Sequence, residues 1–108
     1  MEQSIVKGEK FQAADAVAYS TQAVISRQVL KNEKGNITLF AFDKGEGLSE
    51  HTAPFDAMVL LLDGKAGITI GGKLNILQAG EAIIMPANVP HALNAMERFK
   101  MMLVMIRG

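Results

Sequence analysis

The sequence lacks cysteine, an excess of either charge and any long apolar run. Without cysteine there are no disulfides to indicate secretion. The 11 basic and 11 acidic side chains cancel, so nothing in the charge balance favours nucleic acid or an anionic membrane as a partner. The longest apolar runs, at 57–62 and 101–106, are far shorter than the about 20 residues that a membrane-spanning helix needs.

The first residues also lack the basic start and the apolar stretch of a secretory signal peptide. Together with the absence of cysteine, this pattern predicts a cytoplasmic protein. We expect neither nucleic acid nor a membrane as a partner.

Short apolar runs separated by glycine dominate the 108 residues, a length that suits one domain. Such a pattern favours a β-rich fold. It predicts strands over residues 23–30, 36–42, 58–62, 67–70, 74–77, 82–85, 91–95 and 100–106. Gly71-Gly72 is the clearest hairpin turn and Asp63-Gly64 a weaker one, while residues 11–19 are expected to form at most a short turn of helix. Leu60 and Leu62 share one strand face and are expected to point inward or toward the second sheet.

Two segments, at 45–64 and 80–95, carry glycine, histidine and proline at regular spacing. In the first, Gly45 is followed after five residues by His51, and Gly64 closes the segment. In the second, Gly80 is followed after five residues by Pro86, and His91 lies five residues later. Glycine permits tight turns at strand ends, and proline suits a strand terminus where no ladder donor is needed.

These six anchors resemble the two signature motifs of the cupin superfamily, in particular its small type-2 conserved barrels. The resemblance covers about residues 36–106. It implies an all-β fold, a double-stranded β-helix or jelly-roll barrel. It also implies a single cupin domain over 1–108, divided into an N-terminal strand region (1–35) and a conserved barrel (36–106). Small cupins that resemble this chain usually pair, so we expect a homodimer.

The chain departs from the cupin motifs at the metal ligands. Ala53 stands where the second histidine belongs and Ala57 where the glutamate belongs, which leaves His51 and His91. Asn88 replaces a glycine and Ala95 an asparagine. Because a mononuclear site normally takes at least three protein ligands, we expect a degenerate metal site, with a divalent transition metal as the candidate cofactor.

The nearest carboxylates do not restore the ligand set. Glu50 and Asp56 have the opposite strand parity from His51, Ala53 and Ala57, so in a regular strand they face outward, and only a β-bulge would turn them in. The alternating positions predict that His51, Ala53 and Ala57 face one cavity, which His91 enters from the strand after Pro86. The imidazoles are expected to face each other across an enlarged pocket floored by alanine.

Three functions follow as alternatives. The first is a small-molecule-binding barrel, with His51 and His91 as the polar groups of an apolar pocket at His51, Ala53, Ala57 and His91. The second is a metal-dependent enzyme of dioxygenase, isomerase or decarboxylase type, in which His51 and His91 act with non-protein ligands. The third is a metal-free acid/base enzyme that uses one histidine.

A purely structural role is the remaining interpretation: both histidines form hydrogen bonds to the backbone and bind no ligand. The seven methionines are expected to serve mainly as core packing.

Overall fold

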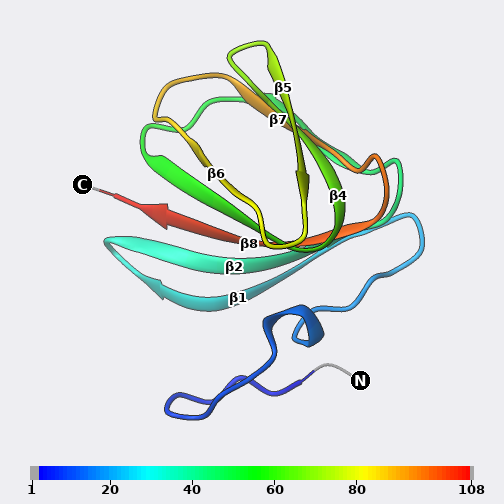
Figure 1. Cartoon of the computed structure of the whole chain (residues 1–108). Helices are drawn as coiled ribbons and strands as arrows, with labels where there is room; N and C mark the ends of the chain where they lie inside the picture. Colours follow the sequence, from blue (N-terminus) through cyan, green and yellow to red (C-terminus); the bar gives the residue numbers. More distant parts are fainter. Residues whose placement is uncertain (1–2, 108) are drawn as a thin grey trace.

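The computed structural model describes residues 3–107, and its regular secondary structure is almost entirely β-strand (Figure 1). One 3-10 helix, η1 (Ala13–Asp15), confirms that the segment 11–19 forms no more than a turn of helix. The strands are β1 (Val24–Asn32), β2 (Gly35–Phe42), β3 (Gly47–His51), β4 (Asp56–Ile70), β5 (Lys73–Gln78), β6 (Ala82–Met85), β7 (His91–Asn94) and β8 (Phe99–Ile106). No helix among these residues is long and apolar enough to cross a membrane.

The strands form two antiparallel sheets that share β4. The first sheet has the order β1-β2-β8-β4-β6, and the second has the order β3-β7-β4-β5. The two sheets curl toward each other and enclose the core, as Figure 1 shows. This arrangement confirms the expected all-β jelly-roll barrel.

Strand β4 is where the sequence-based prediction of strands is wrong. Residues 58–62 and 67–70 are parts of one strand, and Asp63-Gly64 is no hairpin turn. The pairing with β8 shifts register between Leu61 and Asp63, and Gly64 has a φ of 82°. At this irregularity β4 leaves the first sheet and continues into the second. By contrast Gly71 and Gly72, with φ values of 56° and 82°, form the predicted turn.

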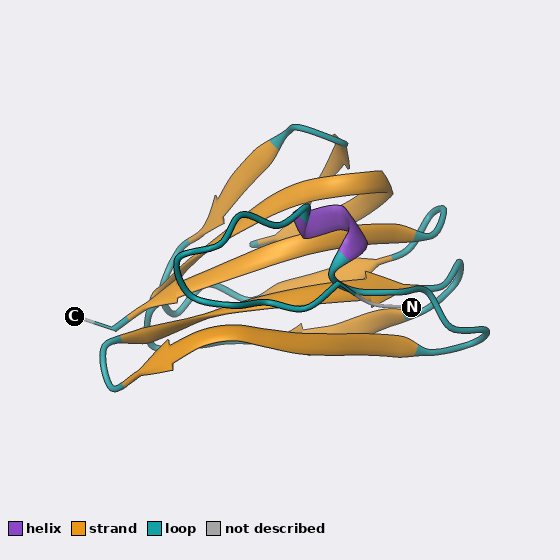
Figure 2. Cartoon of the chain, turned by 90° about the horizontal axis from the view of Figure 1, so that it is seen from below, coloured by secondary structure: helices purple, strands orange, loops and turns teal. Residues whose placement is uncertain are grey.

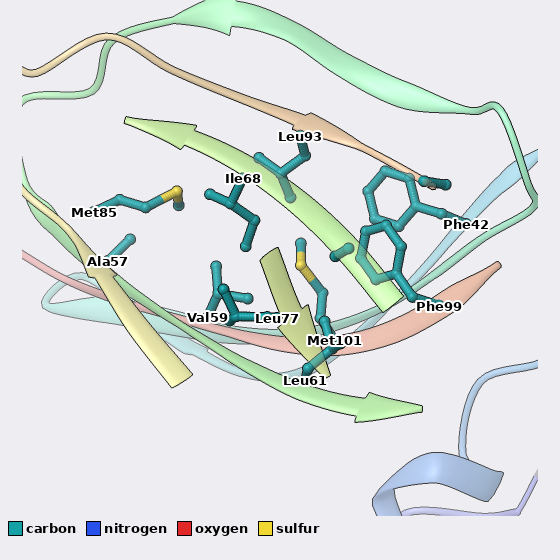
Figure 3. Packing of buried hydrophobic residues seen from close by; sticks show 12 residues of the cluster. Phe42, Ala57, Val59, Leu61, Ile68, Leu77, Met85, Leu93, Phe99 and Met101 are labelled. Atoms are coloured by element: carbon teal, nitrogen blue, oxygen red, sulfur yellow. The ribbon is translucent and has the colours of Figure 1, made fainter. Parts of the chain in front are cut away.

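The core alternates along β4 and changes parity at the irregularity. Val59 and Leu61 are buried before it, and Ala66 and Ile68 are buried after it. The expectation for Leu60 and Leu62 is therefore wrong. Leu61 is the residue that faces the core, and its two neighbours face the outer side of the first sheet. Figure 3 shows the cluster between the sheets, with Phe42 stacked on Phe99 at one end and Ala57 beside Met85 at the other.

The N-terminal segment covers part of the outer face of the first sheet (Figure 2). Ala16 and Val17 are fully buried there against Leu39 and Ala41 of β2. Strand β3 was not predicted, because the sequence GLSEH contains no β-branched residue and only one large aliphatic side chain. It forms one edge of the second sheet and ends with His51.

Candidate ligand and metal site

His51 and His91 are direct neighbours on adjacent strands. They are cross-strand partners of β3 and β7, so their side chains leave the second sheet on the same face. The ring centroids lie 4.4 Å apart, with the ring planes at 69°. The two Nε2 atoms are 3.2 Å apart. The prediction that the rings face each other across a pocket is therefore wrong, because the register of β3 against β7 puts both side by side on one wall.

Backbone carbonyl groups orient both imidazoles. The Nδ1 atom of His51 lies 2.7 Å from the oxygen of Ser49, and that of His91 lies 3.2 Å from the oxygen of Val89. A carbonyl oxygen only accepts, so each Nδ1 donates and each Nε2 is directed at the other. His91 is 5% exposed, whereas His51 is solvent-exposed. His91 thus lies inside the barrel and His51 at its mouth.

All four predicted pocket residues line one cavity between the sheets. His51, Ala53, Ala57 and His91 border a space of about 70 Å³. Its other lining residues are Leu48, Met85, Leu93, Met101, Leu103 and Met105. A larger groove of about 520 Å³ lies on the outside around Leu30 and Val104, but it contains neither histidine. The chemistry therefore points to the smaller, enclosed space.

The expected enlargement of the pocket is wrong. The cavity measures only about 70 Å³, and Met85 and Met105 line it together with the alanines. Both are cross-strand partners of Ala57, Met85 from β6 and Met105 from β8. The alternation of side chains along β8 is enough to predict that Met101, Leu103 and Met105 share one face. Only the pairing register of β4 with β6 and β8 shows that Ala57 lies between two methionines.

Among residues 3–107, no carboxylate completes the histidine pair. Glu50 is exposed, and Asp56 accepts a hydrogen bond of 2.8 Å from the backbone N–H of Ala87 on the outside. The pairing of β3 does shift between Leu48 and His51, but Glu50 stays outside the cavity. Within residues 3–107 no three His, Cys, Asp or Glu side chains gather as metal ligands.

A protein-family comparison matches the cupin domain to residues 38–107. This chain is a cupin. The match includes both histidines and both alanines at the cavity. Among curated proteins, no sequence matches this cupin significantly.

Solved structures support the same assignment. A conserved protein of unknown function from Streptococcus pyogenes is 33% identical, with a TM-score of 0.90 over 100% of this cupin and 96% of that chain. A cupin superfamily protein from Desulfitobacterium hafniense is 25% identical, with a TM-score of 0.91 over 100% and 99%. A cupin 2 conserved barrel domain protein from Leptotrichia buccalis is 38% identical, with a TM-score of 0.87, over 90% of this cupin and 47% of that longer chain.

The turn before β7 shows how this cupin tolerates Asn88 in place of the motif glycine. Asn88 has a φ of 64°, a left-handed conformation that asparagine adopts more readily than most residues. Its backbone N–H donates a hydrogen bond of 2.7 Å to the oxygen of Ala53. The bond ties the segment after His51 to the turn before His91, so it helps to hold the two histidines together.

Proposed function

We propose that this cupin is a small-molecule-binding barrel with a degenerate metal site, in which a ligand binds against the Nε2 atoms of His51 and His91. The proposal rests on one observation: the two imidazoles make more short contacts than they have N–H groups. The imidazole pair makes three short contacts: two from Nδ1 to carbonyl oxygens and one between the Nε2 atoms. Two neutral imidazoles carry only two N–H groups.

The two Nδ1 contacts use both of those protons. The Nε2 atoms then present two lone pairs to each other at 3.2 Å, which is favourable only when a positive group lies against them. A hydrogen-bond donor of a ligand, a metal ion or a further proton meets this need. A ligand that offers only acceptors does not.

The cavity limits the size of the ligand. Its volume of about 70 Å³ is well below the roughly 300–1,000 Å³ of typical small-molecule sites. Methionine side chains have three rotatable bonds and repack readily, so Met85 and Met105 can give space to a small ring. We therefore expect a compact ligand, or the polar end of a larger one that enters past His51.

The alternative is a metal-dependent cupin enzyme of dioxygenase, isomerase or decarboxylase type. The Nε2 separation favours it, because two nitrogen ligands on one tetrahedral zinc, each about 2.0–2.1 Å from the ion, are about 3.3 Å apart. A bound metal would polarise a substrate oxygen. However, two imidazoles without a carboxylate do not fit the three-ligand site that such enzymes normally use.

Phenol and toluene test the proposal, because they match in shape and only phenol carries a donor. Untagged wild-type protein, which has two histidines, is titrated with each while the imidazole nitrogen resonances are followed by NMR. We expect phenol to bind at least tenfold more tightly than toluene, or about 1.4 kcal/mol, and to shift Nε2 of both rings. His51→Phe should abolish this preference. Equal binding of the two probes, or no shift at either ring, contradicts the proposal.

A further inference from the structure

Two methionines flank the position of the missing carboxylate ligand. Ala57 of β4 is paired with Met85 of β6 on one side and with Met105 of β8 on the other. Cross-strand partners share a face, and all three residues line the cavity that also contains His51 and His91. Two methionine side chains thus flank the position at which the cupin motif has its glutamate.

The donors around this cavity are neutral and partly soft. They comprise two imidazole nitrogens and the thioether sulfurs, and none of the lining side chains carries a negative charge. Met85 is 4% exposed, so its side chain is shielded from water. A divalent ion would bring two charges into an apolar space with no anion to balance them, which is costly. Thioether ligands select copper(I), which carries half that charge.

We propose that the ligand of this cavity is a soft monovalent metal ion, copper(I), bound by Nε2 of His51 and His91 and by the thioethers of Met85 and Met105. This inference rests on the proposed function, since it names the ligand of the same site. An ion fits a space of about 70 Å³ that is small for an organic ligand. It also places one positive charge against both Nε2 lone pairs.

Competition for copper(I) tests the inference. Untagged protein is titrated without oxygen against a coloured copper(I) chelator, with silver(I) as a redox-inert probe and zinc(II) and manganese(II) in parallel. We expect one equivalent of copper(I) or silver(I) to bind, with zinc(II) and manganese(II) at least a hundredfold weaker. The Met85→Leu, Met105→Leu double variant should bind copper(I) at least tenfold more weakly than wild type.

Met102→Leu is the matched control, because Met102 lies on β8 but packs against the N-terminal segment on the opposite face. It should bind copper(I) as wild type does. X-ray absorption of the wild-type copper complex should show sulfur as well as nitrogen neighbours, a result that does not depend on whether the variants fold. Nitrogen neighbours alone, equal affinity of the double variant and wild type, or zinc(II) binding as tightly as copper(I) would each overturn the inference.

The outcomes separate this inference from the function on which it rests. If copper(I) does not bind but phenol still shifts both imidazoles, the metal assignment is wrong and the small-molecule site stands. If neither probe reaches the histidines, both proposals fall.

Discussion

Tyr19 is the only tyrosine of the chain and joins the N-terminal segment to the barrel. Its hydroxyl donates a hydrogen bond of 2.6 Å to Oδ2 of Asp63 on β4, and the guanidinium of Arg98 lies 4.4 Å from its ring centroid. Partial burial, and then the hydrogen bond and charge of Asp63, raise the pKa of Tyr19 far above the ordinary tyrosine value, while Arg98 opposes them. The folded protein therefore holds the phenol proton more tightly than the unfolded chain does.

This difference predicts a loss of stability at alkaline pH. Below the unfolded tyrosine pKa of about 10 both states keep the proton, so the contribution of Tyr19 to stability is fully present. Above it the unfolded chain loses the proton first, and the free energy of unfolding falls as pH rises. Tyr19→Phe should cost about 1 kcal/mol near neutral pH, because it removes one partly exposed hydrogen bond.

Urea unfolding of wild type and Tyr19→Phe across alkaline pH tests this prediction by giving the free energy of unfolding of each protein. Lysines titrate in both proteins, so only the difference between the two reports on Tyr19, and it should shrink above about pH 10. Phenolate absorbance gives a direct check, since no other tyrosine contributes. A difference that stays constant with pH would refute the role assigned to Asp63.

Single residues also differ in how well the sequence predicts their position in the structure. Spacing predicts that His51 and His91 border one cavity, as they do in the structure, but it does not predict that both lie on one wall, because that depends on the register of β3 against β7. Leu60 and Leu62 were placed wrongly, since the unbroken apolar run over 57–62 has no alternation to define a face. The role of Met105 could not be predicted, because it depends on which residue the strand register puts opposite Ala57.

At the scale of elements, β4 organises the molecule by belonging to both sheets. The sheets therefore meet where the register shifts after Leu61 and Gly64 takes a positive φ. A Cβ atom there would overlap the carbonyl oxygen of Arg98, and the positive φ is itself unfavourable for other residues. Sequence alone suggests a turn at Asp63-Gly64, because a turn and a bend within a strand both need a glycine with positive φ.

A comparison of two glycines tests this assignment. Gly72 has the same φ of 82° as Gly64, but no neighbouring atom lies within 4 Å of its hypothetical Cβ. Gly72→Ala should lower the free energy of unfolding by about 1–2 kcal/mol, because alanine disfavours the left-handed backbone conformation. Gly64→Ala should cost at least twice as much, because it adds the overlap with Arg98. Equal losses in the free energy of unfolding would mean that β4 does not bend tightly against the segment before β8.

At the scale of the whole molecule, an apolar row crosses the outer face of the first sheet beside the N-terminal segment. Its members are cross-strand partners on all five strands, in the order Ile84, Met58, Val104, Ile37 and Leu30. Ile84 is 61% exposed and Leu30 is 47% exposed. A continuous apolar surface of this kind typically marks an interaction site.

We propose that a second copy of the chain covers this row, which ends on the edge strand β1. Sedimentation at tens of micromolar, a concentration chosen as a rough test of stable association, should show a homodimer. Ile84→Lys with Met58→Lys should yield a folded monomer, because lysine is depleted from the centres of interfaces. Wild-type protein that sediments only as a monomer would exclude the proposal.

The central claim is that both Nε2 atoms, held by carbonyl groups behind them, form the polar end of a binding cavity. Long-range proton–nitrogen NMR of ligand-free, untagged protein tests it directly, because the chain contains only two histidines to assign. The account predicts a proton on Nδ1 of both His51 and His91, and a shift of both Nε2 resonances when phenol or copper(I) is added. An unprotonated Nδ1 on either ring in the ligand-free protein would contradict it.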